Sequence, residues 1–340
     1  MSRIAVVILN YNGEKLLRQF LPSVIANSGE AAIHVADNGS SDSSVFILEA
    51  EFPTVNRIPL RRNFGFCGGY NRALKEVDAD YYVLLNSDVE VTPGWLEPMS
   101  RLMDENPHIG AVQPKILSYT KRSHFEYAGA AGGFIDRFGY PFCRGRLFEH
   151  VEQDHHQYDD IRPVFWASGA CMMIRSPLFH QFAGFDEDFF AHMEEIDLCW
   201  KLQRAGSAVY YCGLSTVYHL GAGTLGYGSP RKAFLNFRNG LTMIVKHYSS
   251  SELLTRLPVR VALDWIAGLM FLLKGKPRLT WAVIRAHGAI IRRLSGTLRK
   301  RSEILKAHPT YPRDQVFPGL VLLDSVFRGQ KPLSFPNSPR

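Results

Sequence analysis

The sequence predicts an α/β fold in which a mostly parallel sheet, flanked by helices, is followed by a C-terminal helical extension. Short apolar runs alternate with amphipathic segments at intervals of roughly 25 residues, as in right-handed βαβ units. Hydrophobic residues make up 46% of the 340 residues and charged residues 21%, which is typical of a globular chain. The sequence contains no internal repeat and no low-complexity linker.

The first 115 residues predict five strands with helices between them. The expected strands span residues 3–9, 32–36, 56–60, 81–85 and 109–113, and the expected helices cover 16–24 and 70–77 and start again near 93. Four of the strands end in turns rich in Asn or Asp. Because open α/β sheets bind ligands at the carboxyl ends of their strands, we expect these turns to converge on one edge.

The fourth expected strand carries the strongest local signal. Tyr81 to Leu85 form a continuous apolar run, as expected for a strand buried on both faces, and Asn86, Ser87 and Asp88 end it. Asp88 is therefore placed where a carboxylate could hold a divalent metal ion, and the metal a diphosphate. The alternative is an Asx turn that closes the strand, since all three residue types favour turns.

The pattern is weaker in the second half of the chain. Residues 117–163 show no clear period, which indicates a long loop or excursion near a site. A strand with a glycine kink is expected at 164–175, and a helix from 192 to about 206. A short strand at 209–212 and a helix at 231–248 follow, and the Pro-rich residues 302–340 carry no assignable pattern.

The net charge of +7 is concentrated near the C-terminus. Residues 256–301 contain eleven Lys or Arg and a single acid, Asp264, whereas the remainder is slightly acidic, which argues against a nucleic-acid-binding surface. Apolar patches at 261–273 and 281–291 alternate with these charges, and neither reaches the ~20 residues that span a bilayer. The pattern favours helices lying on an anionic membrane surface, with an oligomer interface or a helical cap as the alternative.

The cysteines and the N-terminus indicate a compartment. The five cysteines form neither a CxxC pair nor a zinc-binding spacing, and the N-terminal residues lack the pattern of a signal peptide. We therefore expect reduced thiols in a cytoplasmic protein, peripheral at the inner face of the cell membrane.

Five motifs, taken in order, resemble those of family 2 inverting glycosyltransferases, and most of all the bacterial rhamnosyltransferase-like branch. They lie at residues 6–12 (VVILNYN), 37–42 (DNGSSD), 63–69 (NFGFCGG), 86–88 (NSD) and 194–200 (EEIDLCW). The resemblance extends from residue 3 to about residue 248. It implies a glycosyltransferase-A fold, a UDP- or dTDP-linked sugar as donor, and Mg²⁺ or Mn²⁺ as cofactor.

The resemblance also implies which residues bind the donor. Asp37 would contact the pyrimidine base, Asn10 and Tyr11 would line that pocket, and Arg62 and Asn63 would lie beside it.

The spacing of Gly65, Gly68 and Gly69 is wrong for a dinucleotide-binding fingerprint. We interpret them as allowing close approach of a helix and the donor.

For the metal, the resemblance implies two ligands. Asp88 matches the last residue of the family's Asp-x-Asp motif, and Asn86 stands where the first acid is usual. His219 matches a second ligand found in some members, and a carboxylate with a neutral imidazole suits Mg²⁺ or Mn²⁺. A histidine that is simply satisfied in the core is the alternative for His219, and His192 could compete as a ligand.

For catalysis, the resemblance implies that Glu195 is the general base. Two glutamates are adjacent here, so Glu194 remains open as the alternative. Acids at a helix start are often only solvated partners of the helix dipole. The aromatic residues Phe189 and Phe190 before them favour a buried acid with a raised pKa.

The acceptor side is predicted less sharply. Trp166 and Gly169 are candidates to border the acceptor, with a core tryptophan as the alternative for Trp166. Asp197 is grouped with them, although bracing its helix is the other interpretation. Arg231, Lys232 and Arg238 could clamp a diphosphate or be exposed helix charges.

These predictions combine into one expected organisation. Residues 1–248 would form the catalytic domain, with a donor half of about 1–115 and an acceptor half of about 116–248. Residues 249–301 would form the basic segment and 302–340 a tail. The expected activity is inverting sugar transfer to a saccharide or lipid-linked saccharide in surface polysaccharide synthesis. A nucleotidyltransferase and a non-catalytic scaffold of a polysaccharide assembly complex are the alternatives.

Overall fold

A nine-stranded mixed sheet forms the centre of the protein in the computed structural model, which describes residues 2–147, 150–221 and 228–323. Its order is β11-β13-β6-β12-β4-β1-β2-β3, and β5 pairs with β13. The bounds are β1 (Ile4–Asn10), β2 (Ala32–Asp37), β3 (Asn56–Pro59), β4 (Tyr81–Asn86), β5 (Val89–Val91), β6 (Ile109–Ser118), β11 (Ile161–Val164), β12 (Cys171–Arg175) and β13 (Ala208–His219).

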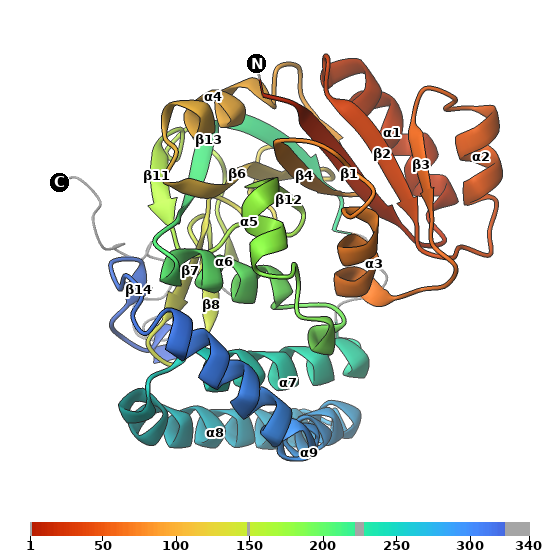
Figure 1. Cartoon of the computed structure of the whole chain (residues 1–340). Helices are drawn as coiled ribbons and strands as arrows, with labels where there is room; N and C mark the ends of the chain where they lie inside the picture. The colour runs from red at the N-terminus through yellow and green to blue at the C-terminus, as the bar shows by residue number, and fades with distance from the viewer. Residues whose placement is uncertain (1, 148–149, 222–227, 324–340) are drawn as a thin grey trace.

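Helices cover both faces of this sheet (Figure 1). Along β1, Val6 and Ile8 pack with residues of α1, α2 and α4, whereas Ala5 and Val7 face the layer that contains α3, α5 and α6. This alternation explains why β1 is apolar up to Asn10: both of its faces are covered. The helices are α1 (Glu14–Asn27), α2 (Ser44–Ala50), α3 (Gly65–Ala73), α4 (Glu97–Glu105), α5 (Ser176–Gln181) and α6 (Glu194–Arg204).

The parallel half of the sheet agrees closely with the prediction. β3, β2, β1 and β4 are parallel neighbours, and Asn10 at the end of β1 is in register with Asp37 at the end of β2. The carboxyl ends of these strands therefore meet at one edge, as predicted. One boundary was wrong: α3 begins at Gly65, five residues before the predicted start, so the glycine-rich segment is its first turn.

The other half differs from the predicted parallel pattern. β12 runs antiparallel between β4 and β6, and of the strand predicted at 164–175 only residues 171–175 form β12, while Val164 is the last residue of β11 and 165–170 are not a strand. The predicted strand at 209–212 is part of the longer β13, which continues to His219 across a bulge.

Residues 117–163 form more than a loop. They contain β7 (Gly133–Asp136), β8 (Pro141–Cys143), β9 (Arg146–Leu147) and β10 (His150–Val151), which build a second, small sheet. The C-terminal strand β14 (Val316–Phe317) joins this sheet beside β7. Part of the predicted tail is therefore ordered against the protein, and residues 324–340 lie outside the described residues.

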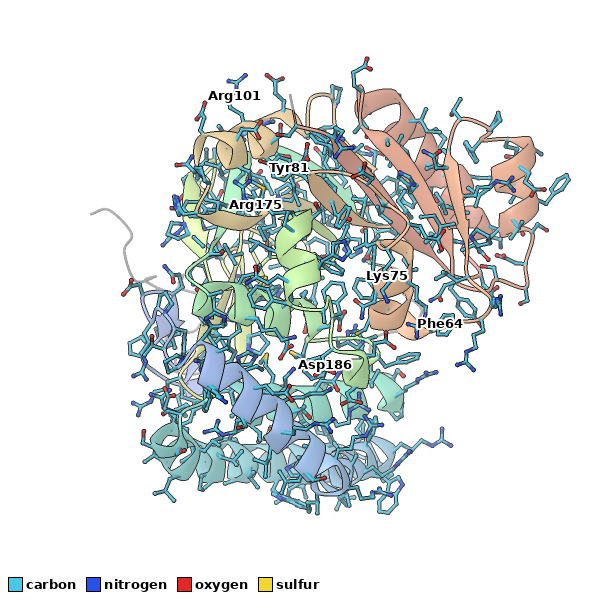
Figure 2. The ribbon with its side chains drawn as sticks, viewed as in Figure 1. Phe64, Lys75, Tyr81, Arg101, Arg175 and Asp186 are labelled. Atoms are coloured by element: carbon cyan, nitrogen blue, oxygen red, sulfur yellow. The ribbon has the colours of Figure 1, made fainter. Side chains whose placement is uncertain are left out.

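Three long helices complete the chain: α7 (Pro230–His247), α8 (Ser250–Leu273) and α9 (Pro277–Ala307). They form a layer below the sheet domain in the view of Figure 1. Figure 2 shows Asp186 at the boundary between the two layers, where it pairs with Lys246 of α7 and Lys300 of α9 at 2.8 and 2.6 Å. In the described part of the chain, none of the helices combines the length and apolar character that crossing a membrane requires.

Candidate active site

The ends of β1 and β2 place three polar side chains together. Asn10 is fully buried, and its Nδ2 donates to Asp37 Oδ1 at 3.0 Å and to Ser40 Oγ at 3.3 Å. Its Oδ1 is buried without a hydrogen-bond partner among the described residues. A Cβ at Gly13 would lie only 2.2 Å from that oxygen, so glycine is required there. The predicted donor residues Asn10 and Asp37 are therefore brought together.

A second turn borders the same edge. Asn38 Nδ2 donates to the carbonyl of Gly65 at 3.0 Å and to Asn63 Oδ1 at 3.3 Å, which ties the turn after β2 to the start of α3. Tyr11 and Arg62 are exposed at this edge, with the Arg62 guanidinium 5.0 Å from the centre of the Phe64 ring.

Gly69 has a packing role. A Cβ there would lie 2.7 Å from a methyl group of Leu9 in β1 and 3.1 Å from Nδ2 of Asn38. The absence of a side chain lets α3 lie close to the end of β1, whereas the predicted close approach of this helix and the donor stays a prediction.

The turn after β4 holds the predicted metal ligands. His219 is paired with Val89 in the β13–β5 ladder, and the amide of Leu220 donates to the carbonyl of Asp88 at 3.0 Å. As a result, His219 Nε2 lies 3.1 Å from Asp88 Oδ1 and 3.4 Å from Nδ2 of Asn86. Asp88 and His219 are both about 4% exposed.

Glu126 completes this cluster from the small-sheet excursion. Its Oε2 lies 3.2 Å from Nδ1 of His219. Burial lowers the pKa of His219, but the hydrogen bonds and charges of Asp88 and Glu126 outweigh it and raise that pKa to about 10. The imidazole is thus oriented by one carboxylate on each ring nitrogen.

The Asp88–His219 pair offers a carboxylate oxygen and an imidazole nitrogen to a divalent cation, but with a pKa of about 10 the imidazole is protonated at neutral pH, so a cation would have to displace the Nε2 proton. Glu126 would then be the carboxylate that orients a metal-binding histidine. Within the described residues, no set of three or more His, Cys, Asp or Glu side chains is arranged to hold a metal, so the protein offers a pair of ligands.

The predicted base lies at the start of α6. Glu194 is 4% exposed, Glu195 is partly exposed, and one Oε of each is buried without a hydrogen-bond partner among the described residues. Burial raises the pKa of Glu195 to about 7, against the opposing effect of backbone N–H donors. Burial and the neighbouring Glu195 hold the pKa of Glu194 well above its usual range. This pair therefore titrates as a unit.

Gly169 connects the base to the metal ligands. A Cβ on Gly169 would lie 3.9 Å from the Cβ of Glu195, and the carbonyl of the next residue, Ala170, accepts from the amide of Asn86 at 3.0 Å. Through these contacts the start of α6 lies beside the end of β4. Gly169 therefore lies beside Glu195, and its predicted place at the border of the acceptor stays a prediction.

The segment before the base has strained backbone geometry. Phe190, His192 and Met193 have positive φ angles of 66°, 70° and 74°, which non-glycine residues rarely adopt. Such geometry persists only where surrounding contacts enforce it, and it concentrates at functional sites.

Asn239 of α7 supplies those contacts. Its Nδ2 lies 3.1, 2.9 and 2.7 Å from the carbonyls of Phe189, Ala191 and His192. Arg238 donates to the carbonyls of Asp188 and Phe189 and, through Nε, to Asn239 Oδ1. Two alternatives were predicted for Arg238, an exposed helix charge and a diphosphate clamp, and both were wrong. Its side chain instead holds the segment that leads to Glu194.

Two predicted acceptor residues are in the core. Trp166 is 5% exposed, its Nε1 donates to the carbonyl of Phe134 at 2.8 Å, and its ring packs on Gly133. It has no exposed face for a sugar, so that prediction was wrong. Asp197 is also fully buried; it pairs with Lys246 at 2.7 Å, His247 at 2.9 Å and Lys201 at 3.0 Å, and braces α6.

The pKa of His192 is shifted in the opposite direction from that of His219. Burial, with the charge of Lys232 adding to it, lowers the pKa of His192 to about 4. Its Nε2 is buried with no hydrogen-bond partner among the described residues.

Sequence reasoning missed Glu126 and Asn239. Glu126 lies in a stretch without periodicity, and Asn239 is one polar residue in a helix that otherwise fits an amphipathic pattern. The one available signal was that Asn239 lies toward the buried face of α7, where an unpaired amide would be costly.

Comparisons with known proteins identify the family of the chain. A model of the family described as glycosyl transferase family 2 matches residues 5–181, more than half of the chain. The N-acetylglucosaminyl-diphospho-decaprenol L-rhamnosyltransferase of Mycobacterium tuberculosis is 25% identical over 319 residues, covering 89% of this chain and 98% of that protein. Rhamnosyltransferase WbbL of Escherichia coli is 23% identical over 215 residues, covering 61% and 80%.

Solved structures share the fold. S. aureus TarS 1–349 in complex with UDP-GlcNAc matches with a TM-score of 0.53 and 18% identity, over 85% of this chain and 81% of that chain. The mannosyltransferase PcManGT of Pyrobaculum calidifontis, in complex with GDP-Man and Mn²⁺, matches with a TM-score of 0.51 and 13% identity, over 91% and 81%. The predicted glycosyltransferase-A type of fold is confirmed, and so is the resemblance to bacterial rhamnosyltransferases. The chain belongs to glycosyl transferase family 2 and is a glycosyltransferase.

Proposed function

We propose that this glycosyltransferase moves one sugar, with inversion, from a UDP- or dTDP-sugar to a lipid-linked saccharide in surface polysaccharide synthesis. The observation that carries the proposal is the environment of the Glu195 carboxylate. Glu195 is a carboxylate with a raised pKa and an oxygen without a partner in the described structure, beside the strand end that carries Asp88. A group with those properties is suited to accept a proton near neutral pH.

In this mechanism Glu195 takes the proton of the acceptor hydroxyl as its oxygen attacks the anomeric carbon of the donor. The bond from that carbon to the diphosphate breaks, and the nucleoside diphosphate leaves from the opposite face. Glu194, buried beside the base, helps to keep the pair protonated up to about neutral pH. Gly169 leaves the space beside Glu195 without a side chain.

The donor would lie along the edge formed by the strand ends. Asp37 and Asn10 would bind the base, with Tyr11, Arg62 and Asn63 bordering it, and Asn86 would lie near the diphosphate. Asp88 and His219 would hold Mg²⁺ or Mn²⁺, with Glu126 fixing the imidazole. A bound divalent ion would stabilise the negative charge that develops on the departing diphosphate.

The comparisons support the choice of substrates. One relative is named for transfer to a diphospho-decaprenol-linked N-acetylglucosamine, and two similar structures contain nucleotide-sugars. In this proposal residues 1–115 form the donor half, 116–248 the acceptor half and 249–301 a membrane-surface segment.

The C-terminal helices support peripheral binding at the inner membrane face. Large apolar side chains are exposed along α8 and α9, among them Trp265, Leu269 and Leu273 at 48%, 55% and 78%. Basic residues flank them, which suits an anionic bilayer. Sedimentation with phosphatidylglycerol vesicles at low salt should be lost when Leu269 and Leu273 are both replaced by Asp. Equal sedimentation of this variant, or none by the native chain, would remove the membrane proposal.

The activity is tested by nucleotide release. The protein, incubated with UDP- and dTDP-sugars and Mn²⁺ but no acceptor, should slowly release UDP or dTDP, and EDTA should stop the release. Replacing Asp88 by Asn should weaken the binding of Mn²⁺, so that a higher Mn²⁺ concentration is needed for the same rate of release. A chain that releases no nucleotide from any of these donors would instead match the non-catalytic scaffold. Formation of a nucleotide-sugar from a nucleoside triphosphate and a sugar phosphate would match a nucleotidyltransferase.

A further inference from the structure

A groove with a volume of about 900 Å³ lies between α7, the first half of α9 and residues 187–190. Its size is within the range of small-molecule sites. We name it the arginine groove, and its main lining residues are Phe190, Arg231, Phe234, Arg278, Trp281 and Arg285.

The positive charges of the arginine groove are available for a ligand. Among the residues that the structure describes, Arg231, Arg278 and Arg285 form no ion pair with a carboxylate. The two acids on the groove wall are already paired: Glu187 with Arg72 at 2.8 Å, and Asp188 with Lys300 at 2.6 Å. The groove is therefore an uncompensated cationic surface, which favours an anion.

Aromatic rings hold two of these arginines in place. The Arg231 guanidinium lies 5.2 Å from the ring centre of Phe190, and that of Arg285 lies 5.3 Å from Phe234. Attraction to a ring does not use the N–H donors of a guanidinium, and two of these donors can bind one phosphate group at two points.

The same rings make the floor of the arginine groove apolar. Trp281 continues this surface at 58% exposure, next to the exposed apolar side chains of α8 and α9. A ligand that suits the groove therefore has an anionic group and a long apolar part.

The arginine groove borders the active site through α7. Consecutive residues at the start of α7 face different ways: Arg231 stacks on Phe190 in the groove, whereas Lys232 acts electrostatically on His192 and is influenced by Glu126. Phe190 is also the first residue of the strained segment that leads to Glu194. An acceptor bound in the groove could thus extend its saccharide towards Glu195.

We infer that the arginine groove binds the diphosphate and the first isoprene units of the lipid-linked acceptor, an inference that rests on the proposed function. The guanidinium groups would bind the diphosphate, and Phe234 and Trp281 would contact the apolar chain, which continues towards the membrane over α8 and α9. The saccharide on the other side of the diphosphate would then face the base.

Direct binding tests this without turnover. Geranyl diphosphate, inorganic pyrophosphate and geraniol would be titrated by calorimetry into the native chain and into the double variant Arg278→Ala/Arg285→Ala. The exposed neighbour variant Arg292→Ala, on the same helix but not lining the groove, is the matched control. Geranyl diphosphate should bind more tightly than either fragment, and the double variant should weaken it by at least about tenfold, whereas Arg292→Ala should not.

Equal binding by all three proteins would overturn the inference. Pyrophosphate binding as tightly as geranyl diphosphate would overturn it too, because a plain anion site would then be enough. If the same loss in the double variant were seen only with phosphatidylglycerol vesicles, the arginines would serve bilayer headgroups and not the acceptor.

A transfer assay adds a second readout. The double variant should lower kcat/KM for a saccharide linked through diphosphate to a lipid by at least about tenfold more than for the same saccharide as a simple alkyl glycoside. An equal loss for both acceptors would contradict the groove. Absence of nucleotide release from the native chain would instead reject the proposed function, while the binding experiment would still decide on the groove.

Discussion

The first turn of α6 carries acids in two opposite environments. Asp197 is surrounded by Lys201, Lys246 and His247, and these partners hold the pKa of its carboxyl well below the usual range despite its burial. Glu194 and Glu195, three and two residues earlier, form no ion pair among the described residues, and the burial of their carboxyl groups raises the pKa of both. The protein thus compensates the charge that supports its fold and leaves uncompensated the charge that can accept a proton.

The contrast explains why residue type alone does not identify a catalytic acid. All three side chains are acidic and lie within four positions on one helix. What separates them is which neighbour each one faces: α7 on one side, and the ends of β4 and β12 on the other. A catalytic carboxylate is therefore recognised by the absence of the partners that a structural carboxylate has.

The largest expected effect is the loss of transfer in Glu195→Gln. Glutamine keeps the shape but cannot accept the proton, so kcat should fall by about 10²- to 10⁴-fold, while donor binding stays intact. Product formation and calorimetric titration of donor would measure the two quantities. Unchanged turnover would refute the assignment, and a much larger loss in Glu194→Gln would move the base to Glu194.

The same variant has a built-in control for folding. Because it removes a buried carboxylate without a cation, thermal unfolding of Glu195→Gln at pH 8 should occur at no lower temperature than in the native chain. A strongly lowered melting temperature would mean that Glu195 is part of the structural network after all.

Asp197→Asn should have the opposite outcome. It leaves Lys201 without a carboxylate partner among the described residues and the buried Lys246 with Asp186 alone, which should reduce the free energy of unfolding by about 3–5 kcal/mol. Denaturant titration measures this. Asp78→Asn, which removes the exposed partner of Arg3, should change it by less than about 1 kcal/mol. If Asp197→Asn lowered the free energy of unfolding by no more than this control does, the contrast between Asp197 and the two glutamates would be wrong.

A smaller effect is expected from the clamp on the strained segment. Asn239→Ala removes the donor shared by three carbonyls before the base, so the segment can relax and Glu195 shifts. We expect kcat to fall by about 10- to 100-fold while the donor dissociation constant stays the same. Thr242→Ala, which removes one local bond on the same helix, is the control and should stay near native activity. A matching loss in both variants would assign the effect to general disturbance of α7.

The sequence predicted the donor side better than the acceptor side, for a physical reason. Strands β1 and β4 are buried on both faces and are recognisable as continuous apolar runs, and Asn10, Asp37 and Asp88 lie at or just after the ends of β1, β2 and β4. The small sheet has strands of two to four residues, and β14 joins β7 from about 180 residues away, so no local pattern marks it.

The misassigned residues follow from the same limit. Trp166 and Asp197 have side chains suited to binding sugars, but tertiary contacts use them for packing and for an internal ion-pair network. Glu126 and Asn239 act only through His219 and the 190–193 segment, to which they are adjacent in space and not in sequence.

The pH dependence of kcat/KM tests the central contrast most directly. A paired or solvated carboxylate would titrate near pH 4, whereas burial raises the pKa of Glu195 to about 7. Below that pH the base is protonated and cannot accept a proton. The account predicts that kcat/KM falls about tenfold per pH unit below an apparent pKa near 7, and that this limb disappears in Glu195→Gln. A profile that stays flat down to pH 5 in the native chain would contradict it.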